Sequence, residues 1–184
     1  MLRGTSENAD TFFQTREAAN TFYLACPETV QRVMDQFAAR TGRAYNLFDY
    51  YGDSAAERVI VLMGSGAQTA IETVDHLVRQ GEKVGVLVVR LFRPFPAARF
   101  GAALPRTLRG LVVLDRTKEA GSVAEPLHLD VIAALQGCGS GEGEHFRTVC
   151  VIGGRYGLSS KEFTPGMVKA VFDELKKARP ADRF

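Results

Sequence analysis

The chain has 184 residues, of which 46% are hydrophobic and 24% are charged, and these proportions are typical of a globular protein and exclude disorder of the whole chain. Its 23 basic and 21 acidic residues leave a net charge of +2, which is too balanced to indicate binding to nucleic acid or to an anionic membrane surface. No apolar run approaches the ~20 residues of a membrane-spanning helix, and the first residues lack the apolar core of a signal peptide. We therefore predict a cytoplasmic protein.

The first 55 residues contain one predicted helix, at residues 29–40, with Pro27 near its start and Gly42 just after its end. Its apolar residues fall on one stripe: Val30, Val33, Met34, Phe37 and Ala38. Aromatic residues stud the polar segment before it and crowd a turn-like stretch after it: Phe12, Phe13, Phe22, Tyr23, Tyr45, Phe48, Tyr50 and Tyr51. Clustered aromatic residues outside a sheet are typical of a segment that buries against something larger. We expect an N-terminal helical and irregular arm.

From residue 56 onward, apolar runs alternate with amphipathic segments. Strands are predicted at residues 58–63, 83–91, 111–114 and 148–152, and helices at residues 67–78, 96–104, 125–135 and 165–175. Thr164 suits the cap of the last helix and Pro165 its first position, and we expect its inward face to hold Met167, Val168, Val171, Phe172 and Leu175. Four β–α units predict an α/β fold over residues 56–178, with an open, mostly parallel β-sheet and helices on both faces. Residues 179–184 are expected to fray.

The cysteines and histidines form no recognisable chemical motif. Cys26, Cys138 and Cys150 are odd in number and widely spaced, which predicts three separate thiols rather than a disulfide, a zinc site or an iron–sulfur site. The three histidines are scattered, and Ser159-Ser160 is typical of a turn before a helix. No spacing supports a set of nucleophile, histidine and acid. We therefore predict no catalytic residue and no metal site.

One candidate binding element is the turn Gly64-Ser65-Gly66, which follows the first predicted strand of the α/β region and precedes a helix. Such a turn can hold a phosphate at the N-terminus of the helix. It lacks the third glycine of the dinucleotide fingerprint, however, and it is not a Walker loop. The same glycines also suit a tight turn, or a contact with a neighbouring domain, where a side chain would not fit. Gly64, Ser65 and Gly66 stay weak candidates for cofactor binding.

Charged residues follow two further predicted strands. Arg90 and Arg93 come after one of them, and Asp115, Arg116 and Lys118 come after the next. Because ligands collect at the carboxyl ends of parallel strands, arginines there could bind phosphate or carboxylate. Ion pairs between domains, and loops that face solvent or an interface, also carry such mixtures of charge. These five residues are candidates for substrate contacts or interdomain contacts.

Several long stretches resemble pyruvate:ferredoxin (flavodoxin) oxidoreductase, an enzyme of anaerobic metabolism that uses thiamine diphosphate and iron–sulfur clusters. The stretches occur in the order of the family and cover almost the whole chain: residues 3–8 (RGTSEN), 47–50 (LFDY), 57–66 (ERVIVLMGSG), 89–95 (VRLFRPF), 114–119 (LDRTKE) and 153–164 (GGRYGLSSKEFT). The resemblance implies that residues 1–55 are the tail of a thiamine-fold domain with its connecting arm. Residues 56–178 would then be a second domain, similar to the C-terminal domain of transketolase.

The resemblance also implies cofactors and partners for a parent enzyme. These are thiamine diphosphate, Mg²⁺, [4Fe–4S] clusters and CoA, with ferredoxin or flavodoxin as electron acceptor and a dimeric parent. Two [4Fe–4S] clusters alone would require about eight cysteines, and this chain has three. We therefore expect no cofactor in this chain, which would need the remaining domains or subunits of the oxidoreductase as partners.

The leading hypothesis is therefore a fragment or subunit of such an oxidoreductase, inactive as this chain alone. The parent reaction would be oxidative decarboxylation of pyruvate to acetyl-CoA, and this part would contribute domain packing and assembly rather than catalytic groups. Two alternatives stay open. One is a stand-alone, non-catalytic interaction or assembly module. The other is an anion-binding or nucleotide-binding domain that uses residues 64–66 with Arg90 and Arg93.

Overall fold

The computed structural model describes residues 6–137 and 144–184. They form two compact units, the first ending at Tyr45 and the second beginning at Asn46. No helix in these described ranges combines the length and hydrophobicity that a bilayer-spanning segment requires. Cys138 lies outside the described residues, and both Cys26 and Cys150 are free thiols.

The first unit is dominated by one long helix, α1, at Ala9–Thr41. The side chain of Asn8 accepts a hydrogen bond of 2.8 Å from the Thr11 N–H at its start, and Gly42 ends it in a left-handed conformation with φ of 72°. The helix continues through Pro27, so the prediction that it starts near residue 29 is wrong. Proline removes one backbone donor from a helix interior, but the capped segment before Pro27 is long enough to stay helical.

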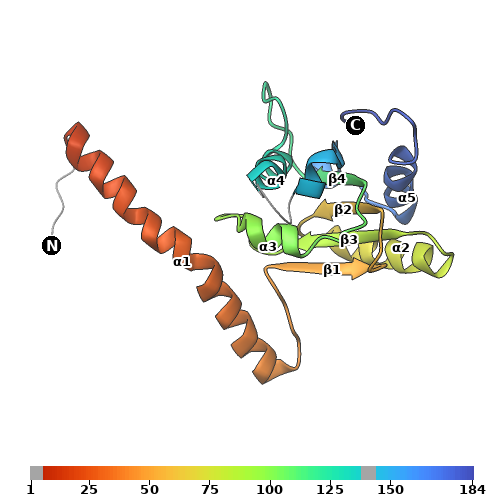
Figure 1. Cartoon of the computed structure of the whole chain (residues 1–184), viewed down its shortest axis with the longest axis horizontal. Helices are drawn as coiled ribbons and strands as arrows, with labels where there is room; N and C mark the ends of the chain where they lie inside the picture. The colour runs from red at the N-terminus through yellow and green to blue at the C-terminus, as the bar shows by residue number, and fades with distance from the viewer. Residues whose placement is uncertain (1–5, 138–143) are drawn as a thin grey trace. The chain divides into compact units, whose positions relative to one another are not determined.

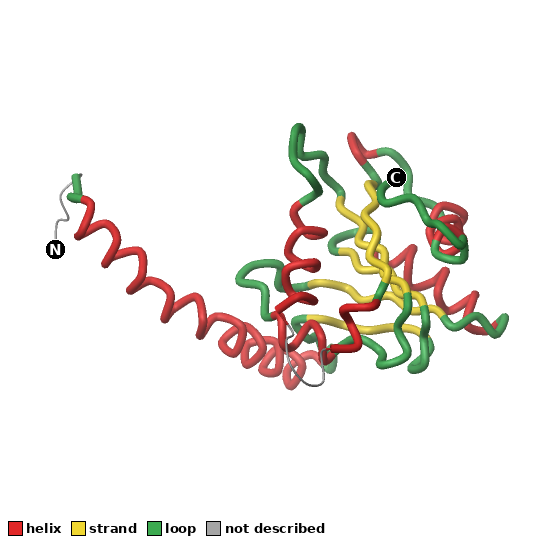
Figure 2. The backbone as a smooth tube through the Cα atoms, turned by 45° about the horizontal axis from the view of Figure 1, so that its top comes forward, coloured by secondary structure: helices red, strands yellow, loops and turns green. Residues whose placement is uncertain are grey.

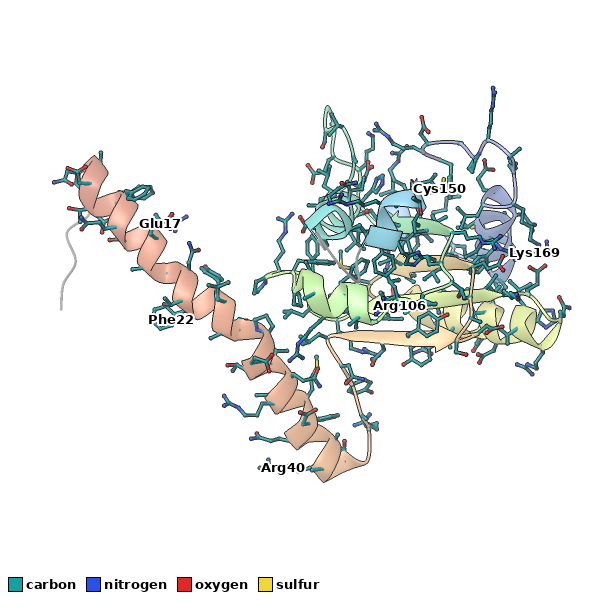
Figure 3. All side chains as sticks on the ribbon, viewed as in Figure 1. Glu17, Phe22, Arg40, Arg106, Cys150 and Lys169 are labelled. Atoms are coloured by element: carbon teal, nitrogen blue, oxygen red, sulfur yellow. The ribbon has the colours of Figure 1, made fainter. Side chains whose placement is uncertain are left out.

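None of the residues of α1 is buried within its own unit. The side chain of Phe22, for example, is 79% exposed and projects from the helix, as does that of Glu17 on the same segment (Figure 3). The aromatic residues of α1 therefore have no core of their own to fill.

The second unit is built on a five-stranded sheet in the order β1-β3-β2-β4-β5. Its strands are β1 (Phe48–Gly52), β2 (Arg58–Leu62), β3 (Val84–Val89), β4 (Gly110–Asp115) and β5 (Cys150–Arg155). The last four are mutually parallel, whereas β1 pairs antiparallel with β3, Tyr50 facing Leu87. The prediction of an open, mostly parallel sheet is confirmed.

Strand β1 was not predicted, because its aromatic residues were interpreted as a turn-like stretch. Aromatic residues favour strands, and Tyr50 lies across β3 at Gly85, where any side chain would collide with the phenol ring. The Tyr50 hydroxyl donates a hydrogen bond of 2.6 Å to the Asp53 carbonyl oxygen. The glycine of β3 therefore makes room for this edge strand.

Helices cover both faces of the sheet, as predicted (Figure 1). Helix α2 (Ala67–Arg79) packs against α5 (Pro165–Glu174), and α3 (Ala97–Ala102) packs against α4 (Pro126–Gly137). Two 3₁₀ turns complete the described elements, at Glu144–Thr148 and Leu158–Ser160. Thr164 caps α5 as predicted, with Pro165 in its first turn. Met167, however, is 40% exposed rather than inward-facing, and it lines a pocket with Tyr156 and Phe163.

Alternate residues of the strands supply the core on each face. The face under α2 and α5 holds apolar side chains from four strands and both helices: Ile60, Leu62, Val74, Leu77, Val84, Val86, Val112, Leu114, Ile152, Val168 and Phe172. Near α3, the rings of Phe48, Phe95 and Phe100 pack with centroids 5.2–5.5 Å apart. Burial on both faces explains why the parallel strands are almost uninterrupted runs of valine, leucine and isoleucine.

The C-terminal residues extend the sheet instead of fraying. The Gly153 N–H donates to the Asp182 carbonyl, the Phe184 N–H donates to Gly153, and the Arg155 N–H donates to Phe184, at 3.0–3.1 Å. The C-terminus accordingly lies beside the end of the sheet (Figure 2). The phenyl ring of Phe184 covers Gly154. The prediction of a frayed tail is therefore wrong for its last three residues, because β5 offers a free edge.

Candidate functional site

The carboxyl edge of the sheet gathers most of the residues that the sequence singled out. The turn Gly64-Ser65-Gly66 follows β2 there. Tyr156 and Arg116, which directly follow β5 and β4, contact it, while Gly64 and Ser65 stay exposed. The Tyr156 hydroxyl donates a hydrogen bond of 3.0 Å to the Met63 carbonyl, and its ring lies where a side chain at Gly66 would be. Burial raises the pKa of Tyr156, so the hydroxyl keeps its proton and acts as a donor. The close approach of this ring explains why Gly66 has no side chain.

Arg116, the residue directly after β4, binds the same turn. Its Nε donates to the Gly157 carbonyl at 3.1 Å and its Nη1 donates to the Ser65 hydroxyl at 2.9 Å. The guanidinium therefore joins the turn after β2 to the turn after β5. Ser65 is exposed and its hydroxyl accepts this hydrogen bond, so Gly64, Ser65 and Gly66 stay candidates for cofactor binding.

Asp115 is the last residue of β4, and it is buried at 1% exposure. Its two carboxylate oxygens accept hydrogen bonds from the backbone N–H groups of Leu127 and His128 at 2.9 and 3.1 Å. Burial raises the pKa of this carboxyl, and the two N–H donors oppose that shift. Asp115 therefore accepts hydrogen bonds from backbone N–H groups in the first turn of α4 and stabilises the start of this helix.

A second buried carboxylate, Glu125, lies beside this cap. Arg155 donates to it from β5 with an Nη1–Oε1 distance of 3.2 Å, and the Lys118 ammonium lies 3.9 Å away. Lys118 is half-exposed, so Arg155 is the principal partner. Removing a carboxylate from water is costly unless a cation and hydrogen bonds compensate it, and these two basic side chains supply that compensation.

His128 is the functional-type residue that sequence reasoning missed. It is 6% exposed, and within the described part of the chain neither ring nitrogen has a hydrogen-bond partner. The ring packs on the backbone of Gly153, where a side chain would collide with it. Burial lowers the pKa of His128, and the charge of Arg183 adds to this effect. The adjacent glycines of β5, Gly153 and Gly154, were the only sequence signal that bulky side chains pack against this strand.

The two arginines after β3 each form an ion pair inside the α/β unit. Arg90 pairs through its Nε with the carboxylate of Asp49, which is nearly buried. Arg93 binds Asp130 of α4 with both Nε and Nη2, at 2.8 and 3.2 Å, and is 61% exposed. Arg90 therefore ties β1 to the sheet, and Arg93 ties the loop after β3 to α4.

A pocket of about 510 Å³ lies beyond β5 against α5. Tyr156, Phe163 and Phe184 supply aromatic walls, and Leu158 and Lys161, which also line the pocket, lie on either side of an unusual turn. Ser159 and Ser160 adopt left-handed conformations with φ of 49° and 60°. Serine tolerates this region at a cost of about 1–2 kcal/mol. The two serines form the turn that their sequence predicted, in a strained form.

The chemistry available to these residues is limited. Asp115, Arg116 and Glu125 are engaged by neighbouring groups, and the described residues contain no cluster of three or more histidine, cysteine or carboxylate side chains that could hold a metal. Cys26 lies in the first unit and Cys150 in the second. The arrangement fastens strand ends to loops. It defines an α/β domain in which Asp115, Arg116 and Glu125 bind other residues of the domain.

This class of domain occurs in a solved 2-oxoacid oxidoreductase. The 2-oxoglutarate:ferredoxin oxidoreductase from Magnetococcus marinus shares the fold with a TM-score of 0.50 and 22% sequence identity, over 70% of this chain and 20% of that one. A family model described as pyruvate:ferredoxin oxidoreductase core domain II matches residues 56–160. The chain belongs to this family.

Curated relatives agree with that assignment. The pyruvate-flavodoxin oxidoreductase of Trichormus variabilis is 60% identical over 100% of this chain, and the pyruvate:ferredoxin oxidoreductase of Moorella thermoacetica is 54% identical over 99% of it. This chain spans about 15% of the length of each of these relatives. The resemblance predicted from the sequence motifs is confirmed.

Proposed function

We propose that this chain serves as the core domain II region of a pyruvate:ferredoxin or pyruvate:flavodoxin oxidoreductase in the cytoplasm. The complete enzyme would convert pyruvate and CoA to acetyl-CoA and CO₂ and would reduce ferredoxin or flavodoxin. The observation that carries the proposal is the 60% identity to such an enzyme over the whole of this chain. In this enzyme the region would support domain packing and assembly rather than bond chemistry.

The described residues of this chain do not form a complete cofactor site, which agrees with a role in domain packing and assembly. Thiamine diphosphate, Mg²⁺, [4Fe–4S] clusters and CoA would bind to parts of the enzyme outside these residues. In the turn after β2, Tyr156 packs on Gly66 and Arg116 binds the Ser65 hydroxyl. The described residues offer no metal-ligand cluster. We therefore derive no catalytic step from this chain.

The exposed arm supports the same proposal. Large apolar side chains of α1 are more than half exposed: Phe12, Phe13, Phe22, Tyr23, Leu24 and Val33. Burying such side chains stabilises an assembly by about 1.5–3 kcal/mol each. The partners would be the remaining domains or subunits of the oxidoreductase, in a dimeric enzyme.

A chimera tests the proposal. The segment of the Trichormus variabilis enzyme that aligns with this chain is replaced by residues 1–184, and pyruvate-dependent reduction of flavodoxin is measured on the purified product. We expect the chimera to assemble and to turn over pyruvate at a rate within about tenfold of the parent, a difference of about 1.4 kcal/mol in activation free energy. The control is the same splice carrying the relative's own segment. A chimera that assembles but is inactive would contradict the supporting role.

Calorimetry on the isolated 184-residue chain separates the alternatives. We expect no measurable binding of thiamine diphosphate, CoA or a nucleoside triphosphate. A sub-micromolar dissociation constant for thiamine diphosphate or CoA, or turnover of pyruvate by this chain alone, would overturn the supporting role. Tight binding of the nucleotide that is lost in Arg116→Ala would favour a nucleotide-binding domain instead.

A further inference from the structure

The pocket beyond β5 has the dimensions of a small-molecule site. Its volume is about 510 Å³, and ligand pockets commonly occupy roughly 300–1,000 Å³. Residues from the end of β5 and the loop after it form one side of the pocket, and residues of α5 form the other, with Phe184 between them. We call this cavity the β5–α5 pocket. All of its lining residues belong to the second unit.

The aromatic walls of the β5–α5 pocket are held in place without a ligand. The Tyr156 ring is anchored through its hydroxyl, and its centroid lies 4.4 Å from that of Phe163. Phe184 is fixed by two backbone hydrogen bonds to β5, and its ring rests on Gly154. Because these rings are already ordered, a ligand that packs on them loses little affinity to the ordering of side chains. The walls therefore suit a planar aromatic ring.

A strained turn borders the same pocket. Leu158 and Lys161 line the pocket, and the two residues between them, Ser159 and Ser160, adopt left-handed conformations with φ of 49° and 60°. Residues other than glycine rarely adopt this region, and such conformations cluster at ligand sites, where they pre-organise the binding groups. The turn fixes the point from which the Lys161 side chain leaves the rim. Backbone strain beside a preformed cavity is a second indication of a ligand site.

Two of the charged side chains that line the pocket are compensated within the chain. The Glu174 carboxylate accepts hydrogen bonds from the Lys177 ammonium and, at 2.9 Å, from the Ala181 N–H. These donors hold the pKa of Glu174 below its usual value, so the carboxylate stays ionised and paired. On the opposite wall, Arg155 donates to Glu125 at 3.2 Å. Neither side chain brings an uncompensated charge to the pocket.

The remaining charges at the rim favour an anion. Within residues 6–137 and 144–184, no carboxylate forms an ion pair with Lys161 or with Arg116. Arg116 lies directly behind the pocket wall, where its Nε donates to the Gly157 carbonyl at 3.1 Å. Glu162 is the one lining carboxylate that lacks a basic partner within the same ranges. Two cations against one carboxylate leave a net positive charge, which attracts a negatively charged ligand.

We propose that the β5–α5 pocket binds a small molecule that carries a carboxylate on a planar aromatic ring. The ring packs against Phe163 and Phe184, and the carboxylate accepts a hydrogen bond from the Lys161 ammonium at the rim. Met167 lines the pocket and is 40% exposed, and its thioether makes favourable contacts with aromatic rings. Neither pyruvate nor the cofactors of the proposed enzyme have this chemistry at this place, so the site is separate from the proposed function.

Calorimetric titration of the full 184-residue chain with 2-naphthoate tests the proposal. We expect saturable binding with a dissociation constant below about 1 mM. Ala170→Trp fills the pocket from the exposed face of α5 and should weaken binding at least about tenfold. Lys169→Trp is the matched control, because it adds the same ring at the neighbouring position of α5, outside the pocket lining (Figure 3), and should leave the affinity unchanged. No saturable binding, or an equal loss in both variants, would overturn the proposal.

The charge of the ligand is tested with the same ring. 2-Naphthylmethylamine, which is a cation at neutral pH, should bind the chain at least about threefold more weakly than 2-naphthoate. Lys161→Ala should remove most of this difference. A preference for the amine in the wild-type chain would contradict the proposed carboxylate, and so would a preference for 2-naphthoate that Lys161→Ala leaves unchanged.

The chimera described above separates a small ligand from a neighbouring domain as the occupant of the pocket. We expect the chimera to bind 2-naphthoate with the same dissociation constant as the isolated chain, and to lose that binding with Ala170→Trp. If another domain fills the pocket in the complete enzyme, 2-naphthoate will bind the isolated chain but not the chimera, and that result would overturn the proposal. The readout is binding rather than turnover, so its failure is distinguishable from a failure of the proposed function.

Discussion

Replacement of Gly66 by alanine separates two explanations of the turn after β2. If the glycine exists to admit a phosphate, alanine leaves the ligand-free protein intact. In the structure, however, a side chain at this position would lie 2.7 Å from the Tyr156 ring. That ring is fixed by its hydrogen bond to Met63 and by Phe163, whose centroid is 4.4 Å away. We therefore expect Gly66→Ala to destabilise the protein in the absence of any ligand.

The magnitude follows from two opposing effects. Gly66 has φ of −67° and ψ of −14°, which alanine adopts freely, so the restriction of the unfolded chain would stabilise the variant by about 0.4–1 kcal/mol. Overpacking against Tyr156 costs about 1–3 kcal/mol. The net loss should be about 1–2 kcal/mol. In a Tyr156→Leu background the ring is absent, and the same substitution should be neutral or stabilising.

Urea unfolding of the four proteins of this double-mutant cycle measures the coupling between Gly66 and Tyr156. Gly166→Ala is the matched control, because its new side chain would meet only the Thr164 hydroxyl at 3.8 Å, and it should not lower the unfolding free energy. A loss from Gly66→Ala that persists unchanged in the Tyr156→Leu background would refute the steric explanation. So would a gain in the wild-type background.

Three further substitutions test the polar contacts of the sheet edge by urea unfolding. Asp115→Ala leaves two buried N–H groups of α4 without an acceptor and should cost about 2–4 kcal/mol; Asp115→Asn keeps one acceptor and should cost less, and equal losses would contradict the capping role. Burial lowers the pKa of His128 below its usual value of 6.5. Below about pH 6.5 the unfolded chain therefore binds a proton at this residue more readily than the folded chain does, and the free energy of unfolding falls as the pH drops. His128→Leu should be at least as stable as the wild type at pH 8 and should lose less stability at pH 5.5; an unchanged pH dependence would rule out His128 as its source. Arg90→Ala should lower the urea midpoint, because it removes the ion-pair partner of the nearly buried Asp49, whose other hydrogen bonds come from Asn46. The exposed Arg93→Ala should not change the midpoint. The opposite order would contradict the assigned ion pairs.

The sequence predicted the parts of the fold that have a periodic signal. Parallel strands buried on both faces appear as valine-rich runs, and their helices follow with caps such as Thr164. Strand β1 gave no such signal, because it is a short edge strand with an aspartate at its second position. The first half of α1 was missed for a related reason: its residues are exposed, and Pro27 suggested a helix start. The pairing of Phe184 with β5 uses backbone groups, which leave no mark in the sequence.

For the candidate site, the sequence located the residues but not their partners. Arg90, Arg93 and Asp115 lie at the carboxyl edge, as expected from the ends of their strands. Arg90 binds Asp49, which is 41 positions away, and Arg93 binds Asp130, 37 positions away. Such pairs depend on the order of strands in the sheet, which local patterns do not specify. The burial of His128 likewise depends on where Gly153 lies in space.

The pairing of β1 with β3 has a consequence for synthesis on the ribosome. The partner of Phe48 is Val89, so β1 is made well before the strand that it needs. At the usual ~5–20 residues per second of translation, about 37 residues of further synthesis leave the aromatic segment unpaired for roughly 2–7 s. A short run of aromatic residues is prone to aggregate during such an interval, and a charge within it opposes this. Asp49 supplies that charge in the nascent chain before Arg90 exists to neutralise it, and the same carboxylate then fastens the finished strand to the sheet.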